Sequence, residues 1–132
     1  MRQTNLFIIC ALLTGCATQP TSHHPTVVEQ KASIGLGEPL TIDYKEICTR
    51  YLLIALKDPE SAKIIWLKKP YEGYIQYGPD SQASLASGGY FVDVLVNSKN
   101  SYGAYAGYTS FAFHFRNNKL KAVKSSAEWV WI

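Results

Sequence analysis

Hydrophobic positions first recur with a helical period. Between residues 43 and 56 they return every three or four positions, which places them on one face of an amphipathic helix. Asp43 and Glu46 stand in the positions of a capping box, and Asp58-Pro59 stops the helix because proline disfavours helical backbone in the residue before it. We therefore predict a helix over residues 44–56. Its apolar face consists of Tyr44, Ile47, Cys48, Tyr51, Leu52 and Ala55.

After residue 62 the hydrophobic period becomes two, which is typical of half-buried strands. Strands are predicted over residues 63–67, 90–97, 109–116 and 119–124, with a polar Gly/Ser-rich loop over 78–89. Residues 74–77 and 129–132 are further candidate strands. One face of the two strongest strands carries Tyr90, Val92, Val94, Val96, Phe111, Phe113 and Phe115. Asn117-Asn118 can adopt the positive φ of a tight hairpin turn. The expected fold class is α+β, with one N-terminal amphipathic helix packed on a four- to five-stranded, mostly antiparallel sheet.

Composition narrows the classes of partner. Of the 132 residues, 47% are hydrophobic and 17% are charged, which suits a single folded domain over residues 41–132. Lysine and arginine together number 13 against 10 acidic residues, and no basic stripe stands out. A nucleic-acid partner is therefore not expected.

The first sixteen residues carry the most informative motif. A short polar start with Arg2 precedes an apolar run over residues 6–13, as in a secretory signal. This run is too short for a transmembrane helix, which needs about 20 apolar residues. It closes on Leu13-Thr14-Gly15-Cys16, which resembles the lipobox of bacterial lipoproteins. The resemblance implies that residues 1–15 are removed and that Cys16 carries diacylglycerol and an acylated amino group, so that acyl chains hold the protein on the membrane.

The segment after Cys16 is expected to be a flexible tether. Residues 16–40 are polar and contain proline, and the hydrophobic positions among them show no period. Ala17 stands where enterobacterial lipoproteins retained in the inner membrane have Asp, so the resemblance implies the outer membrane, facing the periplasm of a Gram-negative host. His23-His24 has no further ligands nearby in the sequence, and we expect neither a metal nor another cofactor.

Cys48 has two interpretations. Cys10 would leave with the signal and Cys16 would carry lipid, so Cys48 is left over. A leftover cysteine in an exported protein indicates a free thiol or an intermolecular disulfide. Its place on the apolar face of the predicted helix favours a buried small hydrophobic residue instead.

Two motifs follow the predicted helix and the strongest predicted strand. Lys57-Asp58-Pro59-Glu60-Ser61-Ala62-Lys63 and Val96-Asn97-Ser98-Lys99-Asn100-Ser101-Tyr102-Gly103 resemble a family of short, uncharacterised exported bacterial proteins that share a KDPxSAK/R turn and a VNxKNSYGGY loop. The resemblance covers residues 45–116 and implies the fold, because the family brings no established activity. Ala104 stands where a second glycine is common. Asp93-Val94-Leu95 stands where relatives have Cys-Gly-Glu, so no disulfide partner for Cys48 occurs there.

The Tyr/Gly-rich stretch over residues 98–108 holds the candidate binding residues. In one interpretation its glycines allow tight bends and its tyrosines cover the end of the sheet. In the other it forms a recognition surface, since tyrosine is favoured at interfaces. The residues proposed for partner contact are Lys99, Asn100, Tyr102, Tyr105 and Tyr108.

No catalytic motif is recognisable, and no catalytic residue is predicted. His114 alternates with the phenylalanines, so we expect it to face solvent or a sheet edge. Ser87, His114 and Asp93 could be combined into a hydrolytic set, and Asp80 and Asp93 are candidate acids only by residue type.

The expected function is therefore a non-enzymatic, lipid-anchored envelope domain that binds a protein or supports an assembly. Two alternatives stay open. One is a binder of cell-wall glycan, or an inhibitor of a wall-cleaving enzyme, that uses the same aromatic surface. The other is a phage- or plasmid-type surface exclusion lipoprotein.

Overall fold

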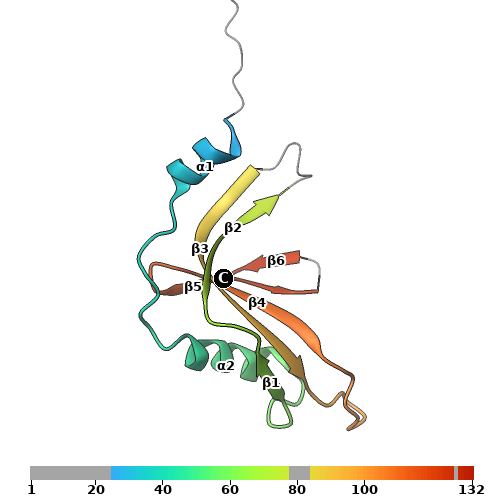
Figure 1. The fold of residues 1–132 in the computed structure, drawn as a ribbon. Helices are drawn as coiled ribbons and strands as arrows, with labels where there is room; N and C mark the ends of the chain where they lie inside the picture. The colour runs from blue at the N-terminus through green and yellow to red at the C-terminus, as the bar shows by residue number, and fades with distance from the viewer. Residues whose placement is uncertain (1–24, 78–83, 127) are drawn as a thin grey trace, which may run out of the picture.

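The structure, a computed structural model, describes residues 25–77, 84–126 and 128–132. Within these residues the chain forms two helices and a six-stranded antiparallel sheet, which confirms the α+β class (Figure 1). The strand count exceeds the expected four or five. The elements are α1 (Val27–Ile34), α2 (Tyr44–Ala55), β1 (Lys63–Trp66), β2 (Tyr71–Tyr77), β3 (Ser84–Asn97), β4 (Thr109–Arg116), β5 (Lys119–Ser125) and β6 (Glu128–Trp131).

The long strand β3 organises the sheet. The strands run in the order β1-β3-β4-β5-β6, and β2 also pairs with β3. Val94 pairs with Trp66 of β1 on one side and with Phe111 of β4 on the other. Phe91 likewise lies between Tyr71 of β2 and a residue of β4. β1 and β2 therefore share one edge of β3 and leave the other edge to β4.

The predicted loop over residues 78–89 is wrong from residue 84 onward, because β3 begins at Ser84. Residues 78–83 lie outside the described part of the chain. The glycines that suggested a loop are needed for close packing within the strand. A Cβ at Gly88 would lie 2.1 Å from the carbonyl oxygen of Gly35, and one at Gly89 would lie 2.2 Å from that of Phe115.

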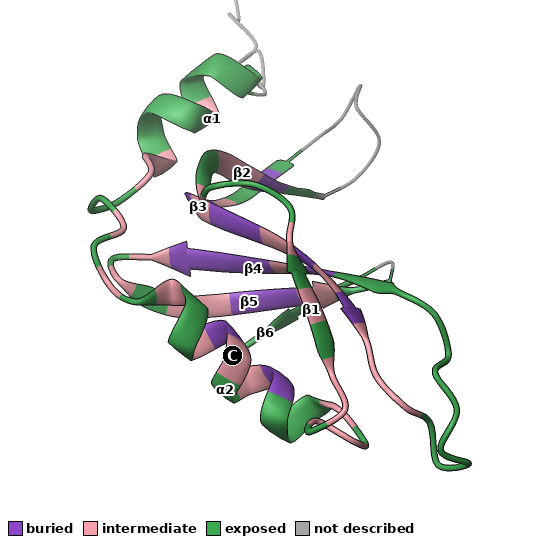
Figure 2. Cartoon of the chain, turned by 60° about the horizontal axis from the view of Figure 1, so that its bottom comes forward, coloured by how far each residue is buried: buried purple, intermediate pink, exposed green. Residues whose placement is uncertain are grey.

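The main core lies between α2 and one face of the sheet (Figure 2). The Asp43 carboxylate accepts a hydrogen bond from the Glu46 amide at 3.1 Å, which is one half of the predicted capping box, while the Glu46 carboxylate pairs with Arg50. The helix ends one residue before the expected position. Cys48 and Leu52 are buried against β3 and β4. The strand residues of this core are Val92, Val94, Val96, Phe111, Phe113, Phe115 and Val123, so the predicted face is confirmed.

His114 does not face solvent, so that expectation is wrong. Its side chain is 0% exposed and lies on the sheet face away from α2. The ring centroids of Phe91, Trp129 and Trp131 lie 4.9, 6.3 and 6.4 Å from that of the imidazole. These rings close over the second face of β4, so both of its faces are buried at this point. The alternation of residue types along a strand separates its two faces, but it does not show whether other residues cover each face.

Part of the expected tether is folded. Residues 27–34 form α1, which begins with a complete capping box between Thr26 and Glu29. No residue of α1 is buried, so polar contacts hold it on the sheet. The Arg116 guanidinium donates to the carbonyls of Ile34 and Gly35 at 2.8 and 2.9 Å.

The β4–β5 turn also fixes the chain between the two helices. Asn117 and Asn118 have φ of 49° and 55°, which confirms the predicted hairpin turn. The Asn117 side chain accepts from the Glu38 amide at 3.0 Å, and the Asn118 side chain accepts from the Thr41 amide at 2.9 Å. The end of α1 and the segment after it are therefore held against the β4–β5 hairpin. The rest of the expected tether and the signal lie outside the described residues.

Candidate binding loop

The connection between β3 and β4 is the candidate binding surface. It lies at the end of the molecule opposite α1 (Figure 1). Residues 100–110 are all exposed. No hydrophobic core covers this exposed stretch. Hydrogen bonds within the loop and to a neighbouring turn therefore hold its conformation.

Asn100 organises the tip of the loop. Its side-chain oxygen accepts hydrogen bonds from the amides of Tyr102 and Ala104 at 2.9 and 3.2 Å. Its amide donates to the Ala104 carbonyl at 2.8 Å, and its carbonyl accepts from Gly103 at 3.0 Å. Gly103 has a φ of +79°, which glycine adopts without strain. Asn100 is exposed, and its hydrogen bonds fix the conformation of the loop tip.

The α2–β1 turn supports the loop from the side. The Lys99 amide donates to the Ser61 hydroxyl at 2.9 Å, and the Tyr105 hydroxyl donates to the Ser61 carbonyl at 3.2 Å. The Lys57 ammonium lies 3.3 Å from the Ser101 hydroxyl. Asp58 holds Ser61 in turn, since its carboxylate accepts from the Ser61 amide at 3.3 Å. The two motifs that carry the family resemblance therefore form one structural unit.

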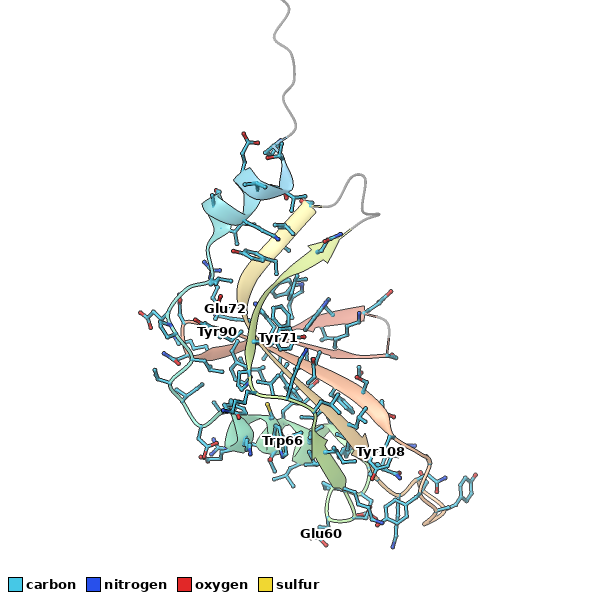
Figure 3. The ribbon with its side chains drawn as sticks, viewed as in Figure 1. Glu60, Trp66, Tyr71, Glu72, Tyr90 and Tyr108 are labelled. Carbon is cyan, nitrogen blue, oxygen red and sulfur yellow. The ribbon has the colours of Figure 1, made fainter. Side chains whose placement is uncertain are left out.

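The three tyrosines of the loop have different environments. Tyr105 is 42% exposed, and its hydroxyl is hydrogen-bonded as described above. Tyr108 is 50% exposed and lies beside the start of β4 (Figure 3). Tyr102 is 95% exposed. Of the five predicted contact residues, Asn100 and Tyr105 serve the loop's structure, and Tyr102 is the one that projects fully into solvent.

Lysines gather around Tyr105. The Lys63 ammonium lies 4.4 Å from the centroid of its ring, and the Lys99 ammonium lies 5.7 Å from it. Sequence reasoning included Lys99 but missed Lys57, Lys63 and Ser61. The signal that could have found them was the joint occurrence of the two motifs, which indicates contact between them.

Ser87, His114 and Asp93 do not form a hydrolytic triad in the structure. Both imidazole nitrogens of His114 are buried without a hydrogen-bond partner, so the ring joins neither Ser87 nor Asp93. The Ser87 hydroxyl lies 3.4 Å from the Gly88 carbonyl, and the Asp93 carboxylate lies 3.4 Å from the Lys68 ammonium. Asp80 lies outside the described residues.

Two side chains have strongly raised pKa values. Burial raises the pKa of the Cys48 thiol to about 12, and no disulfide joins it within the described chain. The structure therefore places Cys48 in the core, as the second interpretation of the sequence expects. Burial, together with the neighbouring Asp93 carboxylate, raises the pKa of Tyr71 to about 12. Cys16, His23 and His24 lie outside the described residues.

Comparisons of this chain with protein-family models, curated proteins and solved structures give no match. In the part of the chain that the structure describes, no helix is long and apolar enough to cross a membrane. Nor do three or more potential metal ligands gather there.

Proposed function

We propose that this chain is a lipid-anchored, non-enzymatic domain of the bacterial envelope that binds a partner protein through residues 98–108. One observation carries the proposal: Tyr102 is 95% exposed at the tip of a loop that hydrogen bonds otherwise fix in place. A large aromatic side chain on a pre-organised loop contributes contact area with little loss of conformational entropy on binding. Such residues are typical interface anchors.

The position of the loop supports the same function. The described chain enters the domain at α1, and the loop lies at the opposite end (Figure 1). The lipobox resemblance puts the acyl chains on Cys16, upstream of α1. Attachment there leaves the loop accessible in the periplasm, and Ala17 favours the outer membrane as the site of attachment.

The loop favours a protein over a glycan as the ligand. Sugar rings stack on exposed aromatic faces, but two lysine ammonium groups already lie over the Tyr105 ring. The loop also protrudes, and a protruding loop gains contact area mainly by entering a concave surface.

The test replaces Tyr102 and Tyr105 separately. Tyr102→Ala should leave the melting temperature unchanged, because the side chain has no hydrogen bond or ring contact in the described structure. It should weaken partner binding by about 2 kcal/mol, roughly 30-fold, as loss of an interface anchor does. Tyr105→Phe should instead lower stability by about 1 kcal/mol through loss of its bond to Ser61.

The measurements are pull-down from solubilised envelopes, thermal unfolding, and co-sedimentation with purified peptidoglycan. Ile54→Ala is the matched control, because Ile54 is 85% exposed on α2. Equal partner recovery with Tyr102→Ala and Ile54→Ala would overturn the proposal. Co-sedimentation with peptidoglycan that depends on Tyr102 would replace it with the glycan-binding alternative.

A further inference from the structure

We infer that the partner presents carboxylate groups around a pocket that accepts Tyr102, so that Lys57, Lys63 and Lys99 contact acidic side chains of a protein. This inference rests on the proposed function of the loop and names the chemistry of the surface that fits it.

The three lysines reach the loop from different parts of the chain. Lys57 follows α2, Lys63 begins β1, and Lys99 follows β3. The Lys57 ammonium is 3.3 Å from the hydroxyl of Ser101, the residue before Tyr102. The other two ammonium groups lie over the ring of Tyr105 at 4.4 and 5.7 Å. One positive charge therefore lies beside the residue before Tyr102, and the other two lie at Tyr105 of the same loop.

These charges are not neutralised within the described chain. The ion pairs of the described residues join Glu46 with Arg50 and Lys68 with Asp93, and include none of the three lysines. Contact with an aromatic ring orients an ammonium group but leaves its charge. An ammonium group has three donors, and hydrogen bonding to Ser101 occupies one of those of Lys57.

Two acids lie near the same end. The Asp58 carboxylate is hydrogen-bonded to the Ser61 amide. Glu60 lies in the turn at the lower end of the molecule in Figure 3. Three lysines and two acidic residues give this end of the molecule a net positive charge. One of the two carboxylates, that of Asp58, already accepts a hydrogen bond within the structure. An approaching surface with carboxylates would satisfy the free donors.

The shape of the loop selects an acidic protein over an anionic membrane. Every residue from 100 to 110 is exposed, and the loop projects from the end of the molecule (Figure 1). A flat bilayer surface would touch only its tip, whereas a pocket can enclose Tyr102 and bring its rim to the lysines. A charged rim around a buried aromatic anchor is the common anatomy of protein interfaces.

The first experiment maps the contacts by zero-length cross-linking in envelopes that contain the full chain. A carbodiimide joins a lysine amine to a carboxylate as an amide, and the water lost is taken up to form the urea. We expect one protein to be joined to the chain through Lys57, Lys63 or Lys99 and its own Asp or Glu. Joining through lysines outside this group, or no joining to a protein, would overturn the inference.

The second experiment measures recovery of that protein with charge variants. K57Q/K63Q/K99Q should lower recovery about tenfold, and raised salt should lower recovery with the wild type. K31Q/K45Q/K119Q is the matched control. It removes the same charge, and Lys31 and Lys45 also lie over aromatic rings, at 5.5 Å each. The control variant should retain wild-type recovery.

The outcomes separate this inference from the proposed function. If Tyr102→Ala lowers recovery and K57Q/K63Q/K99Q does not, the loop binds a protein but the acidic surface is wrong. If neither variant lowers recovery, both proposals are wrong. Binding to vesicles of phosphatidylglycerol that the first lysine variant abolishes and the control retains would assign the lysines to a membrane instead.

Discussion

At the scale of single residues, His114 is a buried titratable group. Its imidazole is fully buried among Phe91, Trp129 and Trp131. Burial lowers the pKa of the ring, the positive charge of Arg116 lowers it further, and the nearby Gly88 backbone offsets part of the shift without completing a hydrogen bond. Below pH about 6.5, His114 binds a proton in the unfolded chain but stays neutral in the folded chain.

We therefore predict that the free energy of unfolding falls as the pH is lowered through this range, until the pH reaches the folded pKa. The slope due to His114 is at most about 1.4 kcal/mol per pH unit. His114→Leu should flatten the profile between pH 7 and pH 5, as measured by urea unfolding at each pH. If the two profiles fall in parallel, His114 does not carry this dependence.

Cys48 should be unreactive in the native domain. The thiolate is the reactive form of cysteine, and burial raises the pKa of this thiol to about 12. An aromatic disulfide reagent at neutral pH should therefore modify Cys48 only after denaturant is added, as measured by peptide mass spectrometry. Cys48→Ala assigns the labelled peptide. Rapid native labelling, or a dimer lost in Cys48→Ala on a non-reducing gel, would favour an intermolecular role.

At the scale of elements, α1 is a helix without a buried residue. Its C-terminal end is fixed by Arg116, which also donates to the Gly88 carbonyl at 2.8 Å. Arg116→Gln should lower the opening free energy of α1 by about 2 kcal/mol, because several charge-assisted hydrogen bonds are lost.

Hydrogen exchange checks this prediction. In Arg116→Gln the amides of residues 27–35 should exchange faster, while those of β3 and β4 stay protected. Lys119→Gln removes one charge from the same hairpin and serves as the control. If the amides of α1 exchange at the same rate in both variants, Arg116 does not hold α1 in place.

The elements differ in how far their sequences predict them. α2 and β4 were predicted to within a residue, because their periodicity reflects burial against one continuous core. α1 was missed because none of its residues is fully buried, so no apolar period marks it. The start of β3 was missed because Gly88 and Gly89 serve close packing, and the sequence alone does not distinguish this use from a turn. Likewise, the sequence identified the loop as distinctive, but only the contacts with Ser61 separate Tyr105 from Tyr102.

At the scale of the whole molecule, the proposed function needs two features, a binding loop and a membrane anchor. The loop at one end is well defined by its contacts, whereas Cys16 lies outside the described residues. The lipobox resemblance therefore carries the membrane attachment, and the two can be tested independently. A soluble variant that keeps the loop should still bind its partner in solution.

Cys16→Ser supplies that variant and tests the anchor. Each buried methylene of an acyl chain contributes about 0.8 kcal/mol, and two or more chains hold a protein stably on a membrane. The wild type should incorporate an alkyne-tagged fatty acid in growing cells and sediment with membranes. Cys16→Ser should do neither, while Cys10→Ser, which changes a cysteine inside the apolar run, should behave as the wild type. Equal labelling of Cys16→Ser and the wild type would contradict lipidation at Cys16, and the loop would then act from a protein held in the envelope by other means.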